Sequence, residues 1–349
     1  MSRSKRKMEH IRFAVETGQL RNTGFDDIKF IHKSIPNLDV TDVSLDCEVG
    51  GLSLSSPIFI NAMTGGGGES TIEANRSLAI AARETGIAMA VGSQMAALKD
   101  PSERKSYEIV RKVNPNGVLI ANLGAEATVE QAKAAIEMIG ANAIQIHLNV
   151  VQELAMPEGD RNFSGVLERI ANVVKFVDVP VIVKEVGFGM SRETVTALAG
   201  IGVKVVDVGG FGGTNFAKIE NLRNTRAKPY FEDWGIPTSI SILEATNTEC
   251  EIDVIASGGI QTSLDVAKSL ALGAKMVGMA GFLLKILIEN NLETLIESIE
   301  DLHEDLSFIM TALGTLNVEM LKRKPLMISG HTHHWLNERK ICTKTYSNR

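Results

Sequence analysis

The sequence predicts a (β/α)8 barrel, or TIM barrel, on the basis of two observations. From Pro57 onward, short apolar segments typical of strands alternate with segments that carry the period of amphipathic helices. Strands that alternate with helices pair in parallel through crossover connections, and eight such units favour a closed barrel over the alternative, a doubly wound open sheet. The predicted strands are 58–61, 88–91, 118–122, 143–148, 181–184, 203–208, 254–256 and 276–279.

One domain accommodates the whole chain. Its 349 residues are 44% hydrophobic and 22% charged, which is ordinary globular composition, and one barrel with insertions reaches this length. We expect an N-terminal helix and hairpin over residues 1–56, the barrel over 57–325 and a tail over 326–349.

Two elements are expected before the barrel. Residues 5–16 have the pattern of a short basic helix that brings Arg6 and Lys7 together, either as a solvated terminus or as a cationic clamp over an anionic ligand. Residues 43–54 alternate apolar and polar side chains around a pair of glycines, which predicts a β-hairpin. We expect this hairpin to plug one end of the barrel.

Two loops are longer than the others, 152–164 after the fourth strand and 209–237 after the sixth. Long loops inside a compact domain are usually functional, and loops that follow barrel strands lie on the face where barrel enzymes keep their chemistry. Helical patterns cover 130–139 and 263–272, and 292–314 has the pattern of a long amphipathic helix.

The tail is dense in histidine, with His331, His333 and His334 close together. Such a cluster could bind a metal ion or contact another subunit. We favour a simple tail or a subunit contact, because residues 331–335 include no acidic or cysteine ligand.

Composition excludes several classes of function. The net charge of −6 gives no general attraction to nucleic acid. Cys47, Cys250 and Cys342 form no CxxC pair and are expected to be reduced thiols. No apolar run is long enough to cross a membrane, and no apolar segment of a secretory signal follows the basic N-terminus. We therefore expect a cytoplasmic protein without nucleic-acid or membrane partners.

The end of the fourth predicted strand is unusually polar. His147, Asn149, Gln152 and Glu153 follow one another within seven residues. Each buried polar group must find a partner, so a folding core does not need this much hydrogen-bonding capacity in one place. The stretch is either a capped strand that leads into a polar loop or a site for a charged small molecule.

Glycine turns after the last two strands predict a phosphate site. Gly258 and Gly259 follow the seventh strand and precede the start of a helix, and Ala280 and Gly281 follow the eighth strand. Glycine lets backbone N–H groups approach a phosphate closely, and a helix start adds partial positive charge. The loops after strands seven and eight hold phosphate in many barrels, although tight turns without a ligand would have the same sequence.

Polar or small residues end the remaining strands as well. Lys184 closes an apolar strand, where a buried lysine is unfavourable unless it faces an anion. One ligand across the barrel mouth, with its phosphate at strands seven and eight, explains all these strand ends. Flavin mononucleotide has this shape, and Lys184 would then lie near the N1–C2=O edge of the ring and stabilise its reduced form. The other strand ends carry Ala62-Met63-Thr64 with four glycines, Ser93, Asn122 and Thr214.

These motifs, taken together, resemble those of the type 2 isopentenyl-diphosphate isomerases. The paired-glycine turn alone is shared by many flavin- and phosphate-binding barrels, whereas the full set is highly specific. The resemblance runs from Arg6-Lys7 to about residue 325, and the histidine-rich tail lies outside it. In chain order the motifs are Met63-Thr-Gly-Gly66, His147-Leu-Asn149, Gln152-Glu153, Lys184-Glu-Val-Gly187, Gly212-Gly-Thr214 and Ala256-Ser-Gly-Gly259.

The resemblance implies an FMN enzyme of isoprenoid synthesis that interconverts isopentenyl and dimethylallyl diphosphate. It implies a flavin reduced by NADPH or NADH, a requirement for Mg²⁺, and assembly into homotetramers or homo-octamers. It also implies that Arg6, Lys7 and Gln152 contact substrate and that Glu153 binds Mg²⁺. The residues it assigns to FMN are Ala62, Met63, Thr64, Ser93, Asn122, Lys184, Thr214, Gly258, Gly259, Ala280 and Gly281.

The chemistry of these residues agrees with that assignment. Arg6 and Lys7 supply cations for a diphosphate. His147 and Asn149 are expected on one barrel face at i, i+2 spacing, where they can bind the substrate by hydrogen bonds to its diphosphate. Mg²⁺ accepts one or two carboxylates together with phosphate oxygens, which suits Glu153. The reaction adds a proton at one carbon and removes one from another, so it needs a positioned acid–base. Because an amide is a poor acid, we hypothesise that the reduced flavin exchanges the proton and that Gln152 orients or relays it.

Two other functions are compatible with parts of the sequence. An FMN-dependent 2-hydroxy acid oxidase uses the same barrel, but it needs a histidine base and an arginine near the last strands, and residues 209–214 contain neither. A catalytically silent phosphate- or nucleotide-binding protein is the other alternative. Polar side chains at so many strand ends argue against it.

Overall fold

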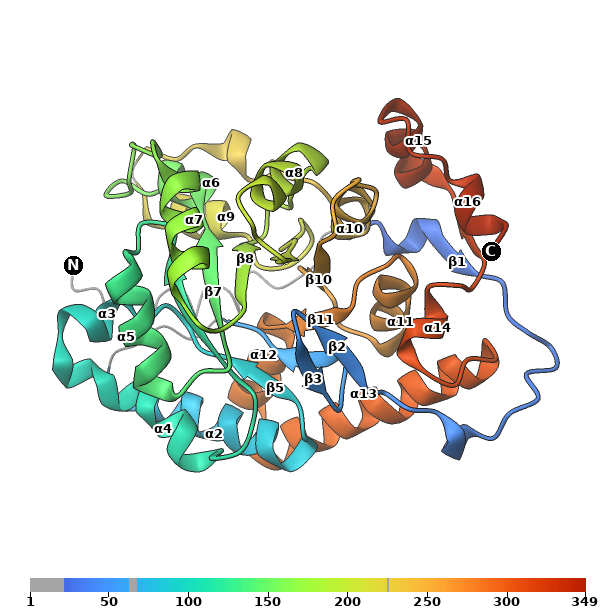
Figure 1. Ribbon diagram of the computed structural model, residues 1–349, viewed down its shortest axis with the longest axis horizontal. Coiled ribbons are helices and arrows are strands. Elements are labelled where there is room, and N and C mark those ends of the chain that lie inside the picture. The colour runs from blue at the N-terminus through green and yellow to red at the C-terminus, as the bar shows by residue number, and fades with distance from the viewer. Residues whose placement is uncertain (1–21, 63–67, 225) are drawn as a thin grey trace.

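The computed structural model describes residues 22–62, 68–224 and 226–349. Within these ranges, eight parallel strands close a barrel in the order β10-β11-β4-β5-β6-β7-β8-β9 (Figure 1). The barrel confirms the predicted fold class and excludes the open sheet, and each strand begins and ends within two residues of its predicted bounds. The strands are β4 (Ile58–Ile60), β5 (Ala88–Ala90), β6 (Leu119–Gly124), β7 (Ala143–Leu148), β8 (Val181–Glu185), β9 (Val205–Asp207), β10 (Asp253–Ser257) and β11 (Met276–Met279).

Helices surround the barrel and bury one apolar face each against it. The predicted helix at 130–139 begins with a capping box between Thr128 and Gln131 and ends where Gly140 adopts a φ of 55°. The long amphipathic helix is also confirmed, and it buries leucine, isoleucine and methionine side chains along one stripe. The helices of the barrel are α2 (Gly68–Thr85), α3 (Met95–Lys99), α4 (Lys105–Val113), α5 (Val129–Ile139), α7 (Val166–Phe176), α8 (Arg192–Gly200), α10 (Thr238–Thr246), α11 (Ser263–Ala271), α12 (Gly281–Glu289), α13 (Leu292–Ala312) and α14 (Val318–Leu321).

The predicted hairpin is formed by β2 (Cys47–Val49) and β3 (Leu52–Leu54). Val49 and Leu54 are buried in a cluster with barrel residues such as Phe59 and Ile255. The hairpin therefore plugs the barrel as expected, at the end where the strands begin. Its turn is fixed there because the N–H of Gly50 donates to Asp253, the first residue of β10, at 2.9 Å.

Alternation along the strands gives the barrel interior an apolar base and a polar upper layer. In β7, Ala143 belongs to the interior apolar cluster, whereas Ile144 and Ile146 pack in the cluster formed with the helices. Side chains two residues apart share a face, so Gln145 and His147 follow Ala143 up the interior. In β4, β6, β8, β9 and β10, the side chain two residues after the interior apolar residue is likewise polar. These polar residues are Asn61, Asn122, Lys184, Asp207 and Ser257.

The two segments expected as long loops are partly helical. The first begins within α6 (Val150–Ala155), and the second contains α9 (Phe216–Arg223) and a 3₁₀ turn, η4 (Pro229–Phe231). Asn215 begins α9 by accepting a hydrogen bond from the N–H of Lys218. Short helices of this kind carry too little periodic pattern to be recognised in the sequence.

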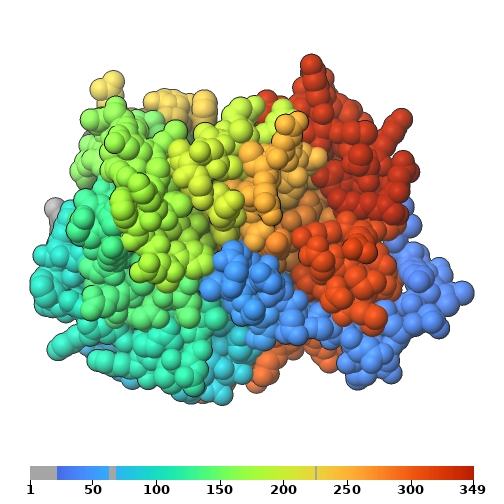
Figure 2. Space-filling model, in the orientation of Figure 1, coloured from blue at the N-terminus to red at the C-terminus, as the bar shows by residue number. Residues whose placement is uncertain are grey.

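Residues 326–349, expected as a tail, are integrated into the fold. β12 (Leu326–Ile328) pairs antiparallel with β1 (Ile28–Phe30), so the two ends of the described chain lie together; Figure 2 shows the red C-terminal part directly against the blue N-terminal segment. The rest forms α15 (Gly330–Glu338) and α16 (Lys344–Ser347). The 3₁₀ turns not yet given are η1 (Phe25–Asp27), η2 (Val40–Asp42) and η3 (Pro101–Arg104).

Ion pairs and a tryptophan hold α15 against the barrel. Glu244 of α10 is 1% exposed and accepts hydrogen bonds from Arg339 Nε at 2.8 Å and Trp335 Nε1 at 3.0 Å. Across the described residues, His331, His333 and His334 belong to no group of three or more His, Cys, Asp or Glu side chains that could hold a metal ion.

The structure also describes the state of the three cysteines and the length and apolarity of the helices. Cys47, Cys250 and Cys342 are all free thiols, and burial raises the pKa of Cys47 to about 12. In the part of the chain that the structure describes, no helix is both long and apolar enough to cross a membrane.

Candidate active site

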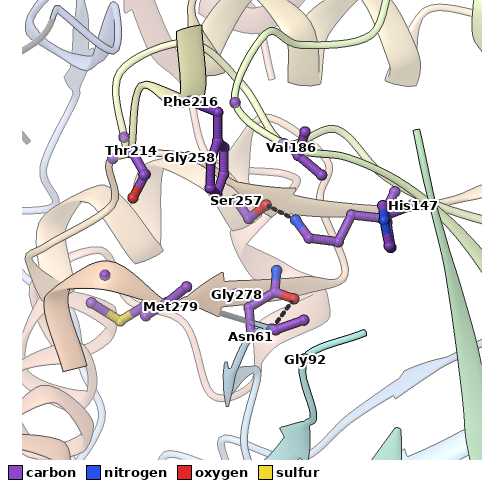
Figure 3. A pocket seen from close by; sticks show the side chains of 18 of the residues that line it. Asn61, Gly92, His147, Val186, Thr214, Phe216, Ser257, Gly258, Gly278 and Met279 are labelled. Carbon is purple, nitrogen blue, oxygen red and sulfur yellow. Dashed lines mark hydrogen bonds between the residues drawn. The ribbon is translucent and has the colours of Figure 1, made fainter. Parts of the chain in front are cut away.

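A cavity opens at the C-terminal ends of the barrel strands (Figure 3). It encloses about 1180 Å³ of space, including its open mouth, and the residues that follow all eight strands line it. The barrel thus places this cavity where loops after parallel strands converge.

Most of the predicted site residues meet in this cavity. Those that line it are Ala62, Ser93, Asn122, His147, Gln152, Lys184, Thr214, Gly258, Gly259, Ala280 and Gly281. Four further predicted residues, Arg6, Lys7, Met63 and Thr64, lie outside the described residues, as does the predicted helix 5–16.

Asn149 and Glu153 do not line the cavity. The strand ends at Leu148, and Asn149 adopts φ −131° and ψ 36° at the start of α6, so the expected i, i+2 alignment with His147 stops there. Asn149 Nδ2 instead donates to Glu153 Oε1 at 2.8 Å, and the N–H of Asp160 donates to Glu153 Oε2 at 2.8 Å. Burial raises the pKa of the Glu153 carboxyl, an effect that these two hydrogen bonds partly offset.

One side of the cavity suits an anion. Ala280 and Gly281, at the start of α12, line the cavity, and no side chain caps this helix. Its first N–H groups and the positive end of its dipole are therefore available to a negatively charged ligand. By contrast, α11 is capped by Thr262, which accepts from the N–H of Asp265. The donor set beside α12 fits the phosphate of FMN, and the residues at the other strand ends leave room for its ring.

The glycine turns after β9 and β10 pack directly on each other. A Cβ atom on Gly258 would lie 2.1 Å from the carbonyl oxygen of Gly210, and one on Gly259 would lie 2.4 Å from that of Gly212. Gly258 and Gly259 also have φ of 109° and 73°, in the left-handed region. Glycine is thus required for the packing of the turns themselves, before any ligand is considered.

Thr23 covers this pair of turns, a contact that no sequence pattern indicated. A Cβ atom on Gly212 would lie 2.5 Å from its methyl group, and one on Gly259 would lie 2.7 Å from it. The carbonyl of Thr23 accepts from the N–H of Ser239 at 2.9 Å, and Lys268 Nζ donates to the carbonyl of Phe25 at 2.8 Å. The start of the described chain is thereby anchored beside the anion-binding side of the cavity.

A chain of buried amides crosses the floor of the cavity. Asn61 Nδ2 donates to Asp207 Oδ2 at 2.7 Å, Gln145 Nε2 donates to Asn61 Oδ1 at 3.0 Å, and Asn122 Nδ2 donates to Gln145 Oε1 at 3.4 Å. A carboxylate can only accept, so it fixes the direction of each amide in turn. The N–H of Ala62 also donates to Asn61 Oδ1 at 2.8 Å, which supports the same orientation.

This chain ends at His147. Its Nδ1 lies 2.8 Å from Asn122 Oδ1. Because that oxygen can only accept, Nδ1 carries the proton, and Nε2 is the ring nitrogen whose protonation can change. Gln145, Asn61 and Asp207 were not predicted as site residues, although a glutamine inside the apolar run Ala-Ile-Gln-Ile was a signal that a buried partner exists.

Lys184 forms an ion pair with Asp207, so its anionic partner is a residue of the protein itself. Lys184 is 7% exposed and its Nζ lies 3.2 Å from Asp207 Oδ2. It also donates to the carbonyl of Glu185 at 3.0 Å and to Ser257 Oγ at 3.4 Å. The buried lysine is thus compensated before any ligand binds.

Gln152 is held by a buried carboxylate on α9. Its Nε2 donates to Glu220 Oε1 at 3.3 Å, and Glu220 is 0% exposed. Arg223 Nη1 donates to Glu220 Oε2 at 2.5 Å. This arrangement restrains the Gln152 side chain, which lines the cavity. Glu220 lies in a predicted loop, so nothing in the sequence indicated that it was buried.

Glu185 holds the chain immediately after Lys184. Its Oε2 accepts from the N–H groups of Val186 and Phe188, both at 2.6 Å. Burial raises the pKa of its carboxyl to about 7, although these N–H groups and Lys184 act in the opposite direction. Since Val186 and Gly187 line the cavity, Glu185 shapes one of its walls.

The chain is similar in sequence to a protein family and to individual known proteins. The model of the FMN-dependent dehydrogenase family matches residues 101–328. A Geobacillus sp. (strain WCH70) protein is 58% identical over 347 residues, 99% of each chain, and a Bacillus cytotoxicus protein is 60% identical over 349 residues, 100% of each chain. Both relatives are named isopentenyl-diphosphate delta-isomerase.

Solved structures show a similar fold at low identity. A mandelate oxidase mutant with an FMN adduct is similar with a TM-score of 0.62 at 18% identity, covering 90% of this chain and 92% of that one. A flavocytochrome b2 with sulfite bound gives a TM-score of 0.67 at 18% identity, covering 92% and 83%. At this identity the likeness concerns the barrel alone.

Proposed function

Because the chain belongs to the isopentenyl-diphosphate delta-isomerase family, we propose that it interconverts isopentenyl diphosphate and dimethylallyl diphosphate with reduced FMN bound at the mouth of the barrel. One observation carries the proposal: a single cavity extends from the uncapped start of α12 to His147 and Gln152. This cavity offers an anion-binding side, a central space for a flat ring and a polar side for a second charged ligand.

FMN would be held by residues from every part of this rim. When bound, it supplies a reduced ring that can exchange a proton with the substrate. NADPH or NADH would reduce it, although the isomerisation itself involves no net redox change. The residues proposed to hold it are Ala62, Met63, Thr64, Ser93, Asn122, Lys184, Thr214, Gly258, Gly259, Ala280 and Gly281.

The substrate diphosphate would bind on the side of β7 and α6. His147 lines the cavity there, and Arg6, Lys7 and Asn149 would add further donors. Glu153 would bind Mg²⁺ together with diphosphate oxygens, since Mg²⁺ needs only one or two protein carboxylates. To do so it would release the hydrogen bond from Asn149. An activity titration with Mg²⁺ on the native chain and on Glu153→Gln tests this role.

Gln152 would orient the reacting carbon chain and relay the proton. Its amide is a poor acid, but its position is fixed by Glu220, and a fixed group lowers the barrier by holding reactants in one geometry. The apolar prenyl group would lie beside Phe216 and Val186, which also line the cavity.

We further propose a homo-oligomer, a tetramer or an octamer. Leu222, Tyr230 and Trp234 are 57%, 65% and 58% exposed, and they lie in or near α9 and η4, beside the cavity. Exposed aromatic side chains of this size are typical of contact surfaces. Light scattering during gel filtration determines the mass of the assembly.

The experiment that tests the function has two steps. The absorbance spectrum of the protein with FMN should show a bound flavin, and an anaerobic assay with isopentenyl diphosphate, NADPH and Mg²⁺ should yield dimethylallyl diphosphate. A bound flavin without turnover would favour a silent binding protein. Oxygen consumption with 2-hydroxy acids, in place of isomerisation, would favour an oxidase.

A further inference from the structure

Asp207 is the most completely enclosed charged group in the floor of the cavity. Its exposed fraction is 0%, and it ends β9 directly beside Lys184 in the strand register. Oδ2 accepts from Asn61 Nδ2 at 2.7 Å and lies 3.2 Å from Lys184 Nζ. Oδ1 accepts from Ser257 Oγ at 2.5 Å and from the N–H of Gly209 at 3.1 Å.

All four of these partners are donors. These donors suit a carboxylate, whose oxygens accept hydrogen bonds. Three hydrogen bonds and the ion pair with Lys184, from four different segments, also restrict the movement of Asp207. The carboxylate of Asp207 is therefore held in place beside the Lys184 ammonium group.

Lys184 is the positive member of this pair, and it lines the cavity. Its ammonium group cannot turn away from Asp207 without leaving the carboxylate unpaired in the barrel interior, which is strongly unfavourable. Any ligand above the floor therefore meets an ammonium group whose charge is largely balanced by the carboxylate beside it.

We propose that Asp207 is a positioning residue that sets the reduction potential of the bound flavin. It holds the Lys184 ammonium group at the cavity wall and offsets its charge. The inference rests on the proposed FMN site, and nothing in the isomerase assignment gives Asp207 a role.

The sign of the effect follows from charge balance. Hydride transfer from the reduced nicotinamide adds two electrons and one proton to the flavin ring, so the ring gains one negative charge. A positive charge nearby favours the reduced ring, and a negative charge disfavours it. Asp207 therefore keeps the potential lower than Lys184 alone would make it.

The test measures the midpoint potential of bound FMN against a reference dye, in a double-mutant cycle. Asp207→Asn keeps the shape and removes the charge, so the equilibrium should shift at least tenfold toward reduced flavin, about 30 mV for two electrons. Lys184→Met should shift it at least tenfold toward oxidised flavin. The double variant Lys184→Met/Asp207→Asn should return to within about threefold of the native value.

A matched control is available at the opposite end of the barrel. Asp253, the first residue of β10, pairs with Lys275 at 2.7 Å. Asp253→Asn removes the same charge from a more exposed lysine–aspartate pair, far from the cavity floor. Its FMN potential should stay within about threefold of the native value, and a shift equal to that of Asp207→Asn would overturn the inference.

The remaining outcomes are also decisive. An unchanged or lowered potential in Asp207→Asn overturns the inference, as does a double variant that resembles Lys184→Met. If Asp207→Asn does not fold, Asp207→Ser, which removes the charge and leaves space for water among the same donors, replaces it in the single and the double variant and decides in the same way. A native protein that binds no FMN contradicts the proposed function instead, whereas bound FMN with unmoved potentials contradicts only this inference.

Discussion

Gln152 Nε2 lies 3.3 Å from Glu220 Oε1, and this contact joins α6 to α9 across the top of the cavity. Arg223 neutralises the same carboxylate at 2.5 Å. An amide tethered to a buried ion pair has little freedom to rotate. The contact therefore restrains the Gln152 side chain where it lines the cavity.

Loosening this tether should slow the reaction while leaving FMN in place. Glu220→Gln removes the charge that Arg223 balances, so we expect turnover to fall by at least about tenfold through lost positioning. FMN binding, measured by absorbance titration, should be unchanged. The matched control is Glu319→Gln, which removes an exposed carboxylate from its pair with Lys322 and should leave turnover at the native value.

Removing the amide itself should have a larger effect. In Gln152→Ala we expect turnover to fall by about 10²-fold, the lower range for loss of a group that takes part in proton transfer, again with normal FMN binding. Full turnover in this variant, with FMN bound normally, would refute the role of Gln152.

Gly258 should not tolerate a side chain. Gly258→Ala places a Cβ atom 2.1 Å from the carbonyl of Gly210 at a φ of 109°, so we expect the free energy of unfolding to fall by at least about 2 kcal/mol. Gly200, in α8, has no heavy atom within 4 Å of such a Cβ, and Gly200→Ala should be neutral or stabilising by up to about 1 kcal/mol. Urea unfolding of both variants measures the difference; equal stabilities would contradict the packing of the two turns.

The last residues should contribute to stability through Arg339. Arg339→Ala leaves the buried Glu244 without its cation, which we expect to lower the free energy of unfolding by about 3 kcal/mol. Lys285→Ala breaks an exposed pair with Glu289 and should change it by less than about 1 kcal/mol. Thermal unfolding of the two variants compares them, and similar melting temperatures would show that α15 is not needed for stability.

Glu185 should make stability depend on pH in the opposite sense from a typical carboxylate. Its pKa is about 7 in the folded chain against a usual 4.5, so the folded state binds more protons between these values. Stability therefore falls as pH rises from about 4.5 to about 7, by up to about 3 kcal/mol, and then stays level with respect to this group.

The variant Glu185→Gln should lose that dependence. The difference in unfolding free energy between the native chain and Glu185→Gln, measured by urea unfolding at several pH values, should decline over this window. A difference that is constant with pH would contradict the assignment of the raised pKa to Glu185.

The elements of the barrel could be predicted because their patterns are local. Apolar residues at every second position predicted β7. A pair of glycines between segments of alternating apolar and polar residues predicted the hairpin at Gly50. The same local rule failed at Asn149, because a period of two applies only while the chain remains a strand, and β7 ends at Leu148.

The residues that complete the site were missed because their partners are distant in sequence. Asn61 and Asp207 are separated by 146 positions and Gln152 and Glu220 by 68. Motif spacing identified residues that face the cavity, such as Lys184, but not the buried groups that hold them. Only the closed barrel brings Asp207 beside Lys184.

The central claim is that the reduced flavin itself takes part in the proton exchange of the isomerisation. The most direct measurement compares anaerobic turnover of isopentenyl diphosphate by protein reconstituted with FMN and by protein reconstituted with 5-deazaflavin mononucleotide, both reduced and with Mg²⁺ present. We predict turnover with FMN and its loss with the deazaflavin, in which carbon replaces N5. Equal turnover with the two cofactors would contradict the claim.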